Sequence, residues 1–117
     1  MKTNNIIANK SFAFAVRVVE AVKYMNTLHV EKNLVNQFLR SGTSIGANVA
    51  EMTDAQSTAD FISKGSIALK EARETEYWIL LLCATNNLTK TQGDSLQKDC
   101  IELIKLLTSI LKTSRMK

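Results

Sequence analysis

Few residues of this chain have the types and spacing that catalysis or metal binding requires. The sequence contains one histidine, His29, and two cysteines, Cys83 and Cys100. Two glutamates, Glu71 and Glu74, are three residues apart, so on a helix they share one face. Such a pair of carboxylates can do general acid–base work, or it can belong to a polar network that fixes the register of two helices. Because no histidine and no metal ligand accompanies the pair, we favour the structural interpretation.

Arrangements known for metal and phosphate chemistry are absent from the sequence. A di-iron helical bundle needs Glu-x-x-His pairs on two helices, and no such pair exists here. The glycine-rich segment 42–46 lacks the Lys-Ser/Thr that ends a phosphate-binding loop, and its two glycines are better explained by close approach of two helices. His29 is expected on the surface or at a helix end. We therefore expect no enzymatic activity, no cofactor and no metal ion.

Composition limits the class of protein and its compartment. The 117 residues are 45% hydrophobic and 22% charged, which suits one domain spanning 1–117. Four glycines and no proline provide too few turns for an all-β sandwich. The longest apolar run, residues 77–84, is too short to span a membrane, and the apolar residues 6–8 are too few for a signal peptide. These features predict a cytoplasmic protein without a membrane partner.

Apolar side chains recur every three or four residues in four segments, which predicts helices at 10–28, 32–52, 57–85 and 89–112. Ser57 and Thr89 begin sequences typical of capping boxes, and Asn86 and Asn87 end the third helix. Short connections make consecutive helices antiparallel. The predicted fold is all-α, an up-down-up-down antiparallel four-helix bundle. In it the two cysteines lie about 10 Å apart along the helices, too far for a disulfide.

A polar stripe follows the predicted second helix beside its apolar seam. When the second and third helices fold back on each other, Arg40 reaches the height of residue 70 and can pair with Glu71 or Glu74. A partly buried carboxylate needs such a cation. We therefore predict a buried or half-buried structural network formed by Arg40, Ser44, Asn48, Glu51, Glu71 and Glu74.

Basic residues on the predicted first and fourth helices form a candidate surface for an acidic partner. The chain has a formal net charge of +4 and a sequence pI near 9.2. Lysines spaced by seven share one face of the fourth helix, and the first helix lies beside it. This face is either an ordinary solvated surface or a stripe that contacts nucleic-acid phosphates. The candidate residues are Lys10, Arg17, Lys98, Lys105, Lys112 and Arg115.

An apolar segment predicts self-association. Residues 77–84 are apolar on every face of the predicted third helix, whereas one four-helix bundle buries only part of each helix surface. The first helix carries two apolar stripes. We therefore expect a subunit interface that includes Tyr77, Trp78 and Leu81 together with part of the first helix.

Four segments of the sequence are similar to a known bacterial family. Residues 37–51, QFLRSGTSIGANVAE, resemble the signature of the bacterial four-helix-bundle family, also called the 23S rRNA intervening-sequence protein family. The segment 60–78, the opening KSFAFA at 10–15 and the closing LLTSILKTS at 106–114 are similar to that family too. The resemblance covers nearly the whole chain.

The resemblance implies a four-helix bundle that assembles as a ring-like homopentamer without known enzymatic activity. Family members are encoded within insertions in ribosomal RNA genes or elsewhere in genomes. A related branch, the accessory variability determinant of diversity-generating retroelements, binds nucleic acid and a reverse transcriptase, and the resemblance does not place this chain in that branch. The expected function is a non-enzymatic oligomeric module that binds RNA, DNA or a ribonucleoprotein. The alternative is a structural or regulatory scaffold that binds another protein.

Overall fold

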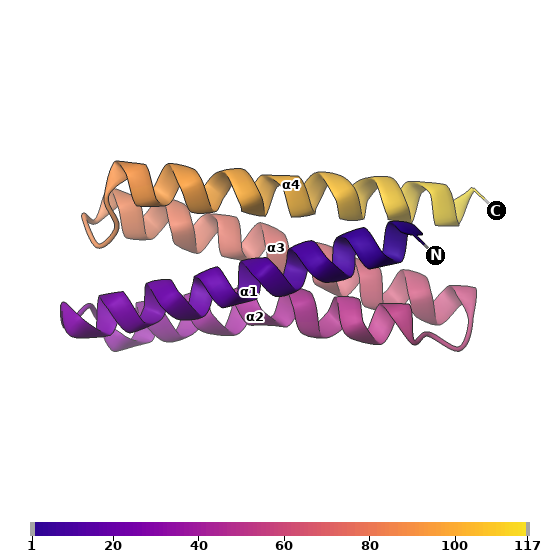
Figure 1. The fold of residues 1–117 in the computed structure, drawn as a ribbon, viewed down its shortest axis with the longest axis horizontal. Coiled ribbons are helices and arrows are strands. Elements are labelled where there is room, and N and C mark those ends of the chain that lie inside the picture. The colour runs from indigo at the N-terminus through magenta and orange to yellow at the C-terminus, as the bar shows by residue number, and fades with distance from the viewer. Residues whose placement is uncertain (1, 117) are drawn as a thin grey trace.

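The computed structural model describes residues 2–116, and four long helices account for nearly all of them (Figure 1). These helices are α1 (Lys2–Thr27), α2 (Lys32–Thr53), α3 (Thr58–Ala84) and α4 (Lys90–Arg115). Contacts join α1 to α2, α2 to α3, α3 to α4 and α4 to α1, so α1 and α3 lie on one diagonal of the bundle. Consecutive helices run in opposite directions, which confirms the predicted up-down-up-down bundle. The rod measures 47 × 20 × 19 Å.

The first helix begins at Lys2 and not near residue 10, which corrects the predicted boundary. Ile7 is fully buried, and it precedes Ser11, Phe14 and Val18 on the same seam at steps of four, three and four residues. Nothing between residues 2 and 10 interrupts a helix, because this segment contains neither glycine nor proline. The apolar repeat therefore starts one turn earlier than the predicted helix. The other helices begin and end within three residues of the predicted positions.

Local side-chain chemistry accounts for the helix ends. Thr89 accepts a hydrogen bond from the backbone N–H of Gln92, whose side chain accepts from the N–H of Thr89, so this N-terminus is a capping box. Ser57 accepts in the same way from the N–H of Asp60 at the start of α3. His29 and Asn86, which follow α1 and α3, have φ of 57° and 65°. This left-handed conformation reverses the chain after each helix.

Gly42 of α2 packs directly against Val18 of α1. A Cβ atom at Gly42 would lie 2.7 Å from Cγ2 of Val18, which is closer than packed carbon atoms come. A Cβ at Gly46 would lie 3.4 Å from the backbone oxygen of Ser11, in nearly ordinary contact. The two glycines therefore differ. Packing requires a residue without a side chain at Gly42, whereas Gly46 has room for a Cβ atom.

We expect Gly42→Ala to lower the free energy of unfolding by about 1 kcal/mol. Overpacking against the stiff side chain of Val18 costs about 1–3 kcal/mol, and the higher helix propensity of alanine offsets about 1 kcal/mol of that. Gly46→Ala is the matched control, because it gains the same propensity with little clash. Equilibrium urea unfolding at one protein concentration measures both variants. A Gly42→Ala variant as stable as Gly46→Ala would contradict the prediction.

Candidate functional site

Arg40 on α2 and two glutamates on α3 form an ion-paired cluster, the Arg40 cluster, on the α2–α3 face. Nη1 of Arg40 lies 3.2 Å from Oε1 of Glu71, and Nη2 pairs with Oε2 of Glu74. The side chain of Arg40 is 48% exposed, whereas Glu71 is 15% and Glu74 is 30% exposed. The structure thus brings together Arg40, Glu71 and Glu74. Their positions along the predicted second and third helices had indicated that these three residues pair.

Neighbouring polar groups complete the hydrogen bonding of the Arg40 cluster. The indole Nε1 of Trp78 donates to Oε2 of Glu74 at 3.0 Å, and Nε of Arg40 donates to Oε1 of Gln37 at 3.4 Å. Beneath the cluster, the hydroxyls of Thr75 and Ser41 are hydrogen-bonded at 2.9 Å and both residues are buried. The role of Thr75 as a polar partner was not apparent from the sequence, because Thr75 lies on the apolar seam of α3.

The three remaining residues of the predicted network do not join the Arg40 cluster through their side chains. The Ser44 hydroxyl donates to the backbone oxygen of Arg40, and the Asn48 amide donates to the backbone oxygen of Ser44, so both bonds stay within α2. Glu51 is exposed and pairs with Lys64 at 3.3 Å. The expectation that Glu51 is buried or half-buried is therefore corrected: it lies near the end of α2, where its face is open to solvent.

The arrangement of the Arg40 cluster suits linking two helices. Each carboxylate is paired with the same guanidinium, and Glu74 also accepts from an indole. In the described part of the chain, no group of three His, Cys, Asp or Glu side chains is placed to hold a metal ion. The guanidinium of Arg40 on α2 pairs with both carboxylates of α3 and thereby fixes the register of α2 against α3.

The two cysteines are free thiols with little nucleophilic character. Burial raises the pKa of the Cys100 thiol to about 12, and the thiol lies 3.2 Å from the backbone oxygen of Ala72, to which it donates. Burial also raises the pKa of the half-buried Cys83, with the carboxylate of Asp94 adding to the effect. Because the thiolate is the reactive form, both groups act as packing residues near neutral pH.

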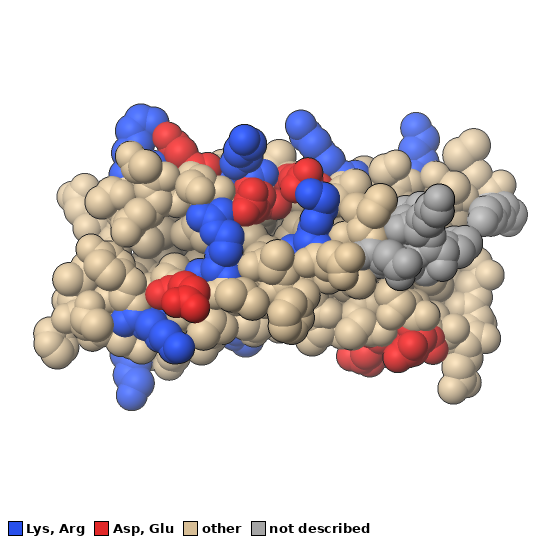
Figure 2. Space-filling view, in the orientation of Figure 1, with Lys and Arg blue, Asp and Glu red and all other residues tan. Residues whose placement is uncertain are grey.

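The outer edge of α4 presents a row of basic side chains, the α4 lysine row, which consists of Lys98, Lys105 and Lys112. All three residues are exposed, and none forms a salt bridge with a residue that the structure describes. Figure 2 shows basic side chains standing along the edge that α4 forms at the top of the view. Seven-residue steps at about 1.5 Å per residue place successive lysines about 10 Å apart along the helix. No aromatic residue occurs in α4.

The other predicted basic residues are held by contacts within the subunit. Nζ of Lys10 lies 3.3 Å from Glu102, and Nη1 of Arg17 lies 2.6 Å from Asp99. These two ion pairs link α1 to α4, so the structure places Lys10 and Arg17 beside α4 but neutralises their charge. Nη2 of Arg115 donates to the Ser66 hydroxyl at 3.1 Å and keeps its charge.

Two apolar surfaces remain exposed on opposite corners of the bundle. On α3, Tyr77 is 57% and Leu80 50% exposed, and together they form the α3 ridge; Trp78 and Leu81 beside them are half-buried. The rings of Tyr77 and Trp78 meet edge to face with centroids 5.0 Å apart. On α1, the exposed apolar side chains include Phe12, Val16 and Val19.

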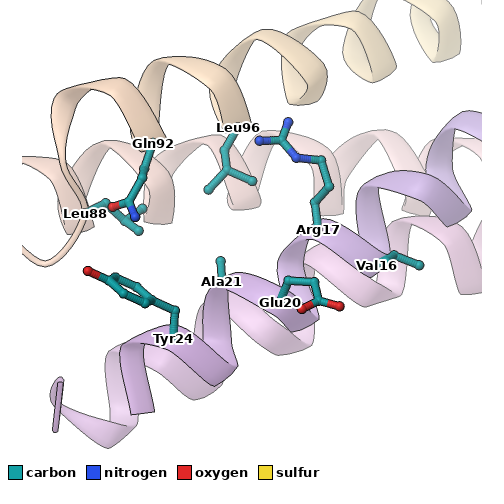
Figure 3. A pocket seen from close by; sticks show the side chains of 8 residues that line it. All are labelled: Val16, Arg17, Glu20, Ala21, Tyr24, Leu88, Gln92 and Leu96. Atoms are coloured by element: carbon teal, nitrogen blue, oxygen red, sulfur yellow. The ribbon is translucent and has the colours of Figure 1, made fainter. Parts of the chain in front are cut away.

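A groove between α1 and α4 was not apparent from the sequence. Its volume is about 400 Å³, and its lining residues are Val16, Arg17, Glu20, Ala21, Tyr24, Leu88, Gln92 and Leu96. Figure 3 shows Tyr24 and Ala21 on α1 facing Leu88, Gln92 and Leu96 across the opening. No sequence signal indicates this α1–α4 groove, because it depends on how far the two helices separate toward the end of α1. We also find no helix in the described residues long and apolar enough to cross a membrane.

Comparison with known proteins agrees with the fold. A solved structure from Bacteroides thetaiotaomicron, described as a protein of unknown function from the S23 ribosomal protein family, is 50% identical and has a TM-score of 0.91. The similarity covers 94% of this chain and 98% of that one. No curated protein matches the chain. Residues 3–109 match the family described as 23S rRNA-intervening sequence protein. This chain therefore belongs to the 23S rRNA-intervening sequence protein family.

Proposed function

We propose that this protein is a non-enzymatic, self-associating accessory module of the cytoplasm that binds nucleic acid through the α4 lysine row. One observation carries the proposal. The three lysines of the row are exposed on one edge of α4, and none of them forms a salt bridge with a carboxylate of the described residues. A row of ammonium groups can contact successive phosphates and release their counterions.

Several features are compatible with a phosphate-directed mode of binding. The charge of the row is not neutralised within the subunit, in contrast to Lys10 and Arg17. The absence of aromatic residues from α4 leaves no stacking platform for single-stranded bases on this edge. The similar structure from Bacteroides is described as a member of a ribosomal protein family, which is compatible with an RNA partner.

Self-association would repeat the lysine row around an assembly. The exposed apolar residues on α1 and α3 support this part of the proposal, because large apolar side chains gathered on one surface usually mark an interface. The family resemblance implies a homopentamer. Repetition of a weak phosphate-binding row raises affinity through avidity.

The proposed binding is expected to depend steeply on salt. The apparent affinity for mixed RNA and DNA duplexes should fall about tenfold or more between 50 and 200 mM salt, because each phosphate contact contributes about 0.9 to the slope of log K against log salt. Gel-shift titrations at the two salt concentrations measure this dependence. Absence of binding even at 50 mM salt would contradict the proposal. It would favour the alternative, a scaffold that binds another protein through the apolar surfaces on α1 and α3.

A further inference from the structure

The two sides of the α4 lysine row differ in charge. Toward α1, the carboxylates of Asp99 and Glu102 lie beside the row and pair with Arg17 and Lys10. The two pairs contribute no net charge, yet their carboxylates remain 43% and 51% exposed. Phosphates placed on this side would approach both carboxylates and be repelled. A nucleic acid that contacts the row is therefore favoured on its other side, toward α3.

Arg73 of α3 supplies a further cation on the side toward α3. It is exposed and forms no salt bridge with any residue that the structure describes. The Cys100 thiol donates to the carbonyl of Ala72, the residue before Arg73, so Arg73 lies at the height of that thiol. This height is between Lys98 and Lys105, the first two members of the row. On the neighbouring helix, Arg73 thus stands opposite the interval between two lysines.

Helix geometry places Arg73 on the α4 side of α3. Glu76, three residues later, is turned toward α4, since its carboxylate accepts from Gln97 at 3.4 Å. Three residues turn an α-helix through about 300°, which is about 60° short of a full turn. Arg73 is therefore rotated about 60° outward from the contact with α4, whereas Lys70 is rotated about 120° and points away from α4. Because Lys70 is an exposed cation on the same helix, it is a matched control for Arg73.

The far end of the row turns toward α3. Seven residues fall about 20° short of two helical turns, so successive lysines rotate gradually around α4. The rotation carries Lys112 toward the side of Arg115, whose Nη2 donates to the hydroxyl of Ser66 on α3 at 3.1 Å. Arg115 therefore adds a second arginine on the side toward α3.

The carboxylates on this side lie at one end of the row. Glu76 is half-buried and accepts from Gln97, and Asp94 pairs with Lys90 at 2.8 Å. Both carboxylates lie at or before the height of Lys98, so the surface beyond that height is positive. We call this surface the α3–α4 basic face, which consists of Lys98, Lys105, Lys112, Arg73 and Arg115.

Uncharged hydroxyl groups lie at the junction of α3 and α4 within this face. Ser66 accepts from Arg115, and the exposed Thr108, seven residues before Arg115, lies on the same side of α4. The Thr108 hydroxyl donates its hydrogen to the carbonyl of Ile104 at 2.7 Å, so both of its lone pairs are available. The junction can therefore accept hydrogen bonds from hydroxyl groups of a partner.

Amide side chains that could read base edges are occupied in α4. Asparagine is absent from this helix, Gln92 completes the capping box, and Gln97 donates to Glu76. Neither amide can pair with an adenine edge without breaking its bond within the subunit. The α3–α4 basic face is therefore suited to contacts with phosphates and sugars, which position a nucleic acid without reading its sequence.

We infer that the α3–α4 basic face binds double-stranded RNA across its minor groove. This inference rests on the nucleic-acid binding in the proposed function and specifies the partner. The minor groove of an RNA helix is wide and shallow, displays 2′-hydroxyl groups and has phosphates along both edges. The face presents the same order, with the α4 lysine row on one side, Arg73 on the other and hydroxyls between them. Neighbouring helix axes lie about 8–10 Å apart, so side chains of α3 and α4 can contact different strands.

Replacing both arginines tests the assignment of the face. Arg73→Gln combined with Arg115→Gln removes two phosphate contacts. For a duplex RNA of about 20 base pairs, the affinity per subunit should fall about 60-fold at 0.1 M salt, and the slope of log K against log salt by about 1.8. Lys70→Gln combined with Lys32→Gln removes the same charge from exposed positions outside the face, so it should lose less than about threefold. Fluorescence anisotropy at several salt concentrations measures both double variants.

The choice of partner is tested with wild type and with Thr108→Val. Wild type should bind duplex RNA at least about tenfold more tightly than duplex DNA or single-stranded RNA of the same length and sequence. Thr108→Val removes the hydroxyl but keeps the shape, so the affinity for duplex RNA should fall about threefold through the loss of one hydrogen bond. The affinity for duplex DNA, which lacks the 2′-hydroxyl, should not change and serves as the internal control. Unchanged RNA affinity of Thr108→Val would overturn the contact with 2′-hydroxyls.

The remaining outcomes separate the inference from the proposed function. Equal losses in the two double variants would remove Arg73 and Arg115 from the binding surface. Equal affinity for duplex RNA and duplex DNA, or tighter binding of single strands, would overturn double-stranded RNA as the partner. Absence of any binding by wild type at about 50 mM salt would instead overturn the proposed function. If Arg115→Gln lowers helicity by circular dichroism, Arg73→Gln alone is compared with Lys70→Gln, and its expected loss is about eightfold.

Discussion

Replacing Lys98, Lys105 and Lys112 together by glutamate is expected to weaken nucleic-acid binding by about 500-fold per subunit at 0.1 M salt. Three phosphate contacts contribute an exponent of about 2.7 to the salt dependence, which corresponds to that factor at this concentration. The carboxylates introduced would also repel the phosphates. Because all three side chains are exposed and unpaired in the described structure, helicity and assembly mass should not change. Fluorescence anisotropy with labelled duplexes measures the affinity.

A second triple variant separates position from net charge. Lys23, Lys32 and Lys70 are exposed lysines on α1, α2 and α3, and their replacement by glutamate lowers the net charge by the same amount. We expect this control to lose affinity by less than tenfold, since only long-range attraction to the phosphates is reduced. Equal losses in the two triple variants would show that overall charge, and not the α4 lysine row, determines binding.

Arg40→Met is expected to lower the free energy of unfolding by about 2 kcal/mol. The substitution leaves the carboxylates of Glu71 and Glu74 in place without their cation, and Glu71 is only 15% exposed. Loss of one partner from a fully buried pair costs about 3–5 kcal/mol, whereas an exposed pair contributes at most about 1 kcal/mol. The half-exposed guanidinium places this cluster between those limits. Equilibrium urea unfolding measures the change at a fixed protein concentration, because the proposed association would also contribute to stability.

Two further variants test the cause of that loss. Lys64→Met removes the cation of the more exposed Lys64–Glu51 pair, so it should cost less than about 1 kcal/mol. Adding Glu71→Gln and Glu74→Gln to Arg40→Met should recover much of the lost stability, since no uncompensated carboxylate then remains. An Arg40→Met variant that unfolds at the same urea concentration as Lys64→Met would contradict the prediction. It would show that the Arg40 cluster stabilises the fold no more than an exposed ion pair does.

The fold followed from the sequence because it depends on regular local geometry. Apolar repeats of three and four residues define one face on each helix, and the absence of proline keeps the helices long. Because short connections make consecutive helices antiparallel, an antiparallel four-helix bundle is the simplest arrangement of these helices. The same regularity predicted that Arg40 meets Glu71 and Glu74, because a rise of about 1.5 Å per residue fixes their heights once the chain folds back. Position along and around one helix is thus encoded locally.

The tertiary structure decided which of the candidate residues remain available to a partner. Lys98 and Lys10 look alike in the sequence, but Lys10 faces Glu102 of α4 whereas Lys98 faces solvent. Glu51 shares the polar stripe of α2 and yet pairs with Lys64 at an open end of the bundle. The α1–α4 groove exists because these two helices separate toward the end of α1. Helix periodicity sets directions within one helix, whereas the spacing between helices and the ion pairs across them result from the packing of all four helices at once.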